Sequence, residues 1–185
     1  MRRAFLPLAA LLLSTTAQAQ VAKEDLAKPP ANAVHYVIQS TGGKHGDSWS
    51  WVLPDGTRMA RESMNLRGQV WEMDYIGKPG KDGLPVRMTV RGVTPSGDAA
   101  ETYSLSGGSA VWQSPIDKGT SDKGAGHFYT TVGGPMDING WFVERLLASP
   151  GRTLQLLPGG AARAERLTSL TLGKGKAARG RGRTR

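Results

Sequence analysis

The segments Val-Trp-Glu-Met-Asp-Tyr (70–75) and Leu-Pro-Val-Arg-Met-Thr-Val-Arg (84–91) decide the fold, because apolar and polar side chains alternate in both. Successive side chains of a β-strand point to opposite faces, so a period of two predicts strands with one buried and one solvated face. The same alternation recurs at 101–106 and 109–113. The Gly- and Pro-rich turns between these runs are too short for parallel crossovers. The stretch 69–113 therefore predicts an antiparallel meander.

Further elements are predicted on both sides of the meander. Strands are expected at 34–38, 48–53 and, with a mixed pattern, 57–65, and a Gly-rich turn is expected at 41–47. A long loop is expected at 116–134, with one short strand near 127–131. The spacing of Ile138, Trp141, Phe142 and Leu146 predicts a helix over 138–148 with Asp137 as its N-cap. Short strands at 154–156 and 163–172 complete the pattern.

These elements predict a mainly β (α+β) fold: a curved antiparallel meander or half-barrel whose apolar face is covered by the helix near 138–148. The antiparallel domain spans residues 33–173. The leader segment 20–32 precedes it and has no apolar period. The tail 174–185 contains little besides Gly, Ala, Lys and Arg, which predicts disorder.

Residues 1–19 have the three regions of an export signal: Arg2 and Arg3, an apolar run over 4–13, and a small-x-small site at 17–19. We expect cleavage between Ala19 and Gln20 and a periplasmic or secreted protein. The paired arginines also suit twin-arginine export, so the export route stays open between that pathway and ordinary secretion. The apolar run is too short to span a bilayer.

The net charge of +9 comes from the two ends of the chain. Eight of the 24 basic residues lie in the first three or the last twelve positions, so residues 20–173 are close to neutral. In an exported protein the basic tail meets no genome, and we expect no specific nucleic-acid partner. The chain contains no Cys, which excludes disulfides, thiolate metal sites and a catalytic thiol.

No catalytic or cofactor motif is present: there is no His-x-His, no His-Glu-x-x-His, no nucleophile elbow and no phosphate-binding loop. We therefore predict no catalytic residue, no metal site and no cofactor. The nearest candidate for a metal site is His45 with Asp47 on a turn and His35 across the hairpin. Glu72 and Asp74 are a candidate carboxylate pair, but we expect them on the solvated face of the sheet.

The large aromatic and Met side chains are the candidate site. If the helix fills the concavity of the sheet they form an ordinary core, and if it does not they line a pocket for an apolar ligand. The sequence favours the core. The residues concerned are Trp49, Trp51, Trp71, Met73, Tyr75, Met88, Tyr103, Trp112, Trp141 and Phe142.

Several stretches resemble the region that precedes the catalytic barrel in exported bacterial amidohydrolases, the imidazolonepropionase-like metal-dependent hydrolases. The resemblance covers about residues 34–173. The stretches are 35–38 (His-Tyr-Val-Ile), 82–86 (Asp-Gly-Leu-Pro-Val), 110–114 (Ala-Val-Trp-Gln-Ser), 141–150 and 154–160 (Leu-Gln-Leu-Leu-Pro-Gly-Gly).

The resemblance implies a non-catalytic domain, because the metal ligands of that family lie in a barrel that this chain lacks. We expect no hydrolase activity from the chain by itself. A shortened or frame-shifted gene and a standalone domain both remain open. The alternative function is a periplasmic carrier that holds an apolar or lipid-like molecule between sheet and helix. If a neighbour of the strand 167–172 is missing, its open edge predicts self-association.

Overall fold

The computed structural model describes residues 21–167, which form a mostly β fold with 51% strand and one α-helix. Nine strands build an open antiparallel sheet in the order β1-β2-β3-β4-β5-β7-β8-β9, with β6 paired to β5. This confirms the predicted fold class. The strands are β1 (Val34–Ser40), β2 (Gly43–Val52), β3 (Arg58–Leu66), β4 (Gln69–Pro79), β5 (Pro85–Thr94), β6 (Gly97–Asp98), β7 (Glu101–Ser106), β8 (Ser109–Gln113) and β9 (Lys118–Ser121).

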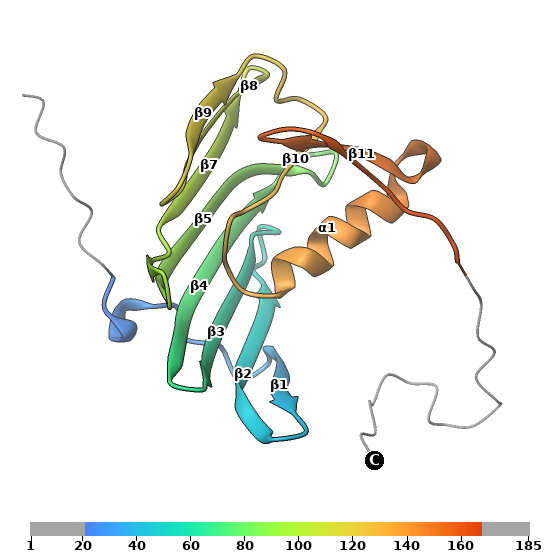
Figure 1. The fold of residues 1–185 in the computed structure, drawn as a ribbon. Helices are drawn as coiled ribbons and strands as arrows, with labels where there is room; N and C mark the ends of the chain where they lie inside the picture. The colour runs from blue at the N-terminus through green and yellow to red at the C-terminus, as the bar shows by residue number, and fades with distance from the viewer. Residues whose placement is uncertain (1–20, 168–185) are drawn as a thin grey trace, which may run out of the picture.

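The sheet curves around the helix α1 (Asp137–Ala148), which lies against its concave side (Figure 1). We call this side the inner face. Register partners across antiparallel strands point to the same face. Ser50, Ala60, Tyr75 and Val90 are successive partners across β2 to β5, so they share the inner face. Trp49, by the same argument, lies with Arg61, Asp74 and Arg91 on the outer face.

The core fills the space between the inner face and α1. Trp141 is 1% exposed, its ring packs edge-on against Phe128 at 5.5 Å, and its indole N–H donates to the carbonyl of Gly83. A side chain at Gly77 would overlap both this indole and the Tyr75 ring, so the glycine permits the close approach of helix and sheet. The buried cluster joins strands β3, β4, β5, β7 and β8 to the helix, β10 and β11.

A second, three-stranded sheet carries the chain to and from the helix. Its strands are β10 (His127–Tyr129), β11 (Thr153–Leu157) and β12 (Ala161–Arg163), and β10 pairs with β11 in parallel. The short 3-10 helix η2 (Pro150–Arg152) links α1 to β11. Two expectations were wrong: residues 118–121 form a strand instead of loop, and residues 164–167 are not in a strand.

The leader segment is not a detached extension. Residues 21–27, which we call the N-terminal strap, lie across the outer face and include the 3-10 helix η1 (Lys23–Asp25). Leu26 of the strap is 4% exposed. The predicted turn at 41–47 is also different, because β2 already begins at Gly43. The expected edge strand at 167–172 lies almost wholly outside the described residues, as do the signal and the basic tail.

A candidate acidic cleft on the inner face

The inner face is not covered evenly. Residues 130–136, the crossing segment, run from β10 over the sheet to the start of α1, and a cleft of about 610 Å³ lies beside this segment. The turn after β5 and the residues after β8 form its other walls. Six of its lining residues define what we call the acidic cleft: Glu62, Trp71, Met73, Asp98, Glu101 and Ile116.

Glu62 lies at the centre of β3 and points inward, because its register partner is Met73 of the core. It is 4% exposed. Its Oε2 accepts a hydrogen bond from the backbone N–H of Met136 at 3.1 Å, and no described residue donates to its Oε1. Burial raises the pKa of Glu62, because the charged form loses hydration without gaining a cationic partner.

Glu101, on β7, is 2% exposed and is held differently. The Tyr129 hydroxyl donates to its Oε1 at 2.7 Å, and the N–H of Val132 lies 3.0 Å from both carboxylate oxygens. The Gly133 N–H donates to Oε2 at 3.4 Å. Burial raises the pKa of Glu101, although these bonds oppose the rise. Both carboxylates therefore anchor the crossing segment, but only Glu62 keeps an oxygen without a donor.

The walls of the cleft are mostly apolar, and its charged lining residues are all acidic. Met73 is 2% exposed, Trp71 is half-buried, and Ile116 is 78% exposed at the rim. Asp98 adds a third carboxylate, whose Oδ1 accepts the N–H of Ala100. Among the described residues that line the cleft, none is Lys, Arg or His. The arrangement can hold a small molecule that is mostly apolar and tolerates a negative field.

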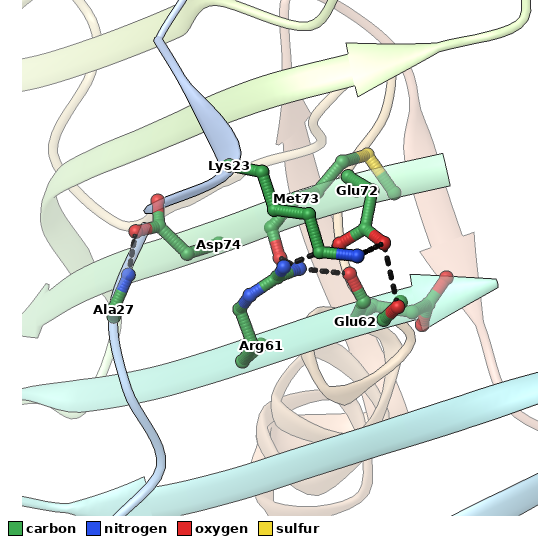
Figure 2. A network of polar contacts seen from close by, with 8 residues as sticks. Lys23, Ala27, Arg61, Glu62, Glu72, Met73 and Asp74 are labelled. Carbon is green, nitrogen blue, oxygen red and sulfur yellow. Dashed lines mark hydrogen bonds and ion pairs between the residues drawn. The ribbon is translucent and has the colours of Figure 1, made fainter. Parts of the chain in front are cut away.

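The acids of the outer face are fully paired. Figure 2 shows Lys23 of the strap and Arg61 converging on Glu72, while Ala27 meets Asp74. Burial acts to raise the pKa of Glu72, but hydrogen bonds from Lys23, Ser63 and Arg61 outweigh it and lower the pKa. Arg91 forms an ion pair with Asp74, and this bond raises the pKa of Arg91.

The expectation that Glu72 and Asp74 lie on a solvated face was therefore wrong. They are 8% and 0% exposed, because the strap covers the outer face and two guanidinium groups neutralise the charges. This cover is hard to predict from the sequence, since the strap is polar apart from a few apolar residues such as Leu26.

The aromatic set predicted from the sequence divides between the two faces. Seven of its members belong to the inner face or to α1, and an eighth, Trp71, lines the cleft together with Met73. Trp49 and Trp51 are the exceptions: their strand turns Ser48 and Ser50 inward, so both tryptophans lie outside, and Trp49 stacks on His35 at 5.1 Å. The seven are Met73, Tyr75, Met88, Tyr103, Trp112, Trp141 and Phe142.

The candidate metal ligands are only partly brought together. The Nε2 of His35 lies 2.7 Å from Asp47 Oδ1, and Lys44 takes the other oxygen at the same distance. The hydrogen bond from Lys44 lowers the pKa of Asp47. His45 bonds to the Ser40 hydroxyl instead. Among residues 21–167 there is no group of three side chains suited to hold a metal ion.

Comparison with protein-family models, with curated proteins and with solved structures finds no match. The resemblance to amidohydrolases thus stays a prediction. Within the part of the chain that is described, no helix has the length and apolar character to cross a membrane.

Proposed function

We propose that this chain is a non-catalytic binding domain that holds a small, largely apolar molecule in the acidic cleft. The observation that carries the proposal is the cleft itself: about 610 Å³ of space against Trp71 and Met73, beside the core that packs α1 on the sheet. Sites for small molecules have this size and this mixture of apolar walls with a few polar groups.

Binding is favoured over catalysis by the state of the two carboxylates. Acid–base catalysis by a pair of acids requires both to reach the substrate. Glu101 is occupied by donors from Tyr129, Val132 and Gly133, so of the two acids only Glu62 has an oxygen to which no described residue donates. A buried acid with one free oxygen, in a cleft with mostly apolar walls, suits recognition.

Titration with Nile red, a neutral apolar dye, tests the proposal. We expect saturable binding at micromolar concentration. Ala99, 6% exposed in the cleft wall, gives the blocking variant: Ala99→Phe is expected to weaken binding at least ten-fold. Ala31→Phe makes the same change at an exposed position and serves as the control. Unsaturable binding, or equal affinity in Ala99→Phe and wild type, would refute the proposal.

We also propose that the protein is exported, with residues 1–19 removed. The basic, apolar and small-x-small regions of that segment support it. The intact mass of protein from the periplasmic fraction is the test, and soluble protein that keeps Met1 would contradict it. Replacing Arg2 and Arg3 by Lys is expected to stop export only if the twin-arginine route is used.

A second candidate function is the non-catalytic N-terminal region of an amidohydrolase-like protein. What supports it is the set of resembling stretches, which lie in β1, β8, α1 and β11 and so extend over both sheets and the helix. Sequencing the gene beyond codon 173 tests it. An open frame that encodes His-x-His in any register supports the candidate, and its absence supports a standalone domain.

A further inference from the structure

Glu62 is unusual because it is a deeply buried acid whose carboxylate forms no ion pair with a described basic side chain. Its register neighbours are Ser48 and Met73, which are 5% and 2% exposed. Within residues 21–167, the carboxylate accepts one hydrogen bond, from the backbone of Met136. An ionised carboxylate buried in this way is costly unless charge and hydrogen bonds compensate it. The Oε1 atom has no such compensation among the described residues.

On the outer face of the same sheet, buried acids are paired with arginines. On the adjacent position of β3, Arg61 points outward and binds Glu72, and Arg91 binds Asp74. The cleft instead gathers three carboxylates with no basic side chain among its described lining, whereas residues 20–173 as a whole are close to neutral. The negative potential is therefore local to the cleft.

We infer that the acidic cleft takes a cationic amphiphile, a small molecule with an ammonium group on an apolar body, and that Glu62 Oε1 is its counter-ion. An ammonium group at this atom supplies both the missing charge and the missing donor. The attraction is strong because the surroundings have a low dielectric constant. The apolar body lies against Met73 and Trp71. This inference deepens the proposed function and rests on it.

Three probes of equal chain length test the inference: octylamine, octan-1-ol and octanoate at pH 7.5, followed by tryptophan fluorescence and calorimetry. They carry a positive charge, no charge and a negative charge on the same apolar body. We expect octylammonium to bind at least ten-fold more tightly than octanol, and octanoate to bind most weakly. Glu62→Gln should abolish the preference for the cation while octanol affinity stays within two-fold.

Glu24→Gln is the matched control, because it removes the same charge at an exposed position of the strap. It should keep the full preference. Gln at position 62 can still accept the Met136 N–H, and near-UV circular dichroism checks that the variant is folded. The probe series on the wild-type protein needs no variant, so the inference remains testable if Glu62→Gln misfolds.

The outcomes separate the two proposals. Equal binding of octanol and octylamine by the wild-type protein would overturn the cationic ligand and leave the apolar cleft intact. A cation preference that persists in folded Glu62→Gln would overturn the role of Glu62. Failure of all three probes and of Nile red to bind would overturn the proposed function itself.

Discussion

The acidic residues on the two faces of the large sheet have different kinds of partner. On the outer face, Glu72 and Asp74 are buried beneath the N-terminal strap and bound by Arg61, Arg91 and Lys23. On the inner face, Glu62 and Glu101 are buried as deeply, but only neutral donors reach them. The direction of the pKa shift depends on the partner: the pKa of Glu72 is lowered, and the pKa values of Glu62 and Glu101 are raised. Burial alone therefore does not distinguish the candidate site from the outer face. What distinguishes it is that its buried acids have no Lys or Arg partner among the described residues.

The largest effect is expected from breaking the outer pairing. Arg61→Ala leaves Glu72 buried without its guanidinium, and should lower the free energy of unfolding by about 3–5 kcal/mol in urea denaturation. Arg87→Ala, an exposed arginine on the same face, is the control and should stay within about 0.5 kcal/mol. A small loss in Arg61→Ala would mean that Glu72 is hydrated and the faces are not so different.

The next effect tests whether the strap really covers the outer face. Leu26→Ala removes its buried apolar side chain and should cost about 2 kcal/mol, at the low end for such changes because the strap is near the surface. Leu167→Ala, at a position 92% exposed, should change stability by less than about 0.5 kcal/mol. If Leu26→Ala is equally neutral, the strap is not held in solution.

A smaller effect of opposite sign is expected on the inner face. Glu62→Gln removes an uncompensated charge and keeps the acceptor for the Met136 N–H, so it should raise the free energy of unfolding at pH 7 by about 1 kcal/mol. Thermal melts of the variant and the wild-type protein measure this directly. Destabilisation would show that Glu62 has a cationic partner in solution, and would remove the contrast between the faces.

The smallest effect is the pH dependence, where the faces act in opposite directions. The pKa values of Glu62 and Glu101 are raised above 4.5, so their ionisation destabilises the fold as pH rises through the raised values. Lowering the pH from 7 towards 5 should therefore add stability, by less than about 1 kcal/mol. The lowered pKa of Glu72 contributes stability above 4.5 that is lost as pH falls further. As the pH is lowered from 7, urea denaturation should show stability first rising and then falling, and Glu62→Gln should show a smaller rise.

The strands of the meander could be predicted from the sequence because one of their faces packs against the core. Apolar and polar side chains therefore alternate there without interruption. The prediction that Trp49 and Trp51 of β2 share this apolar face was wrong. There the inner positions Ser48 and Ser50 lie beside the start of α1, where small polar side chains fit, and the tryptophans turn outward. The size of a side chain is a poor guide to its face at the margin of a core.

The acidic cleft was missed although a signal for it existed. Glu101 shares its parity with Tyr103 and Leu105, so the pattern itself places a carboxylate on the apolar face. Arg61 and Glu62 are adjacent and therefore point to opposite faces, which means that a charge must be buried if both faces are covered. The cover of the outer face by the strap, and the position of residues 130–136, depend on contacts between distant parts of the chain that no local pattern reveals.

The order of the elements along the chain has a consequence for synthesis. All nine strands of the large sheet precede Phe128 and Trp141, which cover its inner face. Neighbouring strands pair in sequence, so the sheet can begin to form while its cover is still being made. At a synthesis rate of about 5–20 residues per second, the face that carries Met73, Tyr75 and Met88 stays uncovered for seconds before the helix is complete. During that interval the nascent chain presents an apolar concave surface to chaperones and to other chains, and a product cut short before Trp141 never covers it.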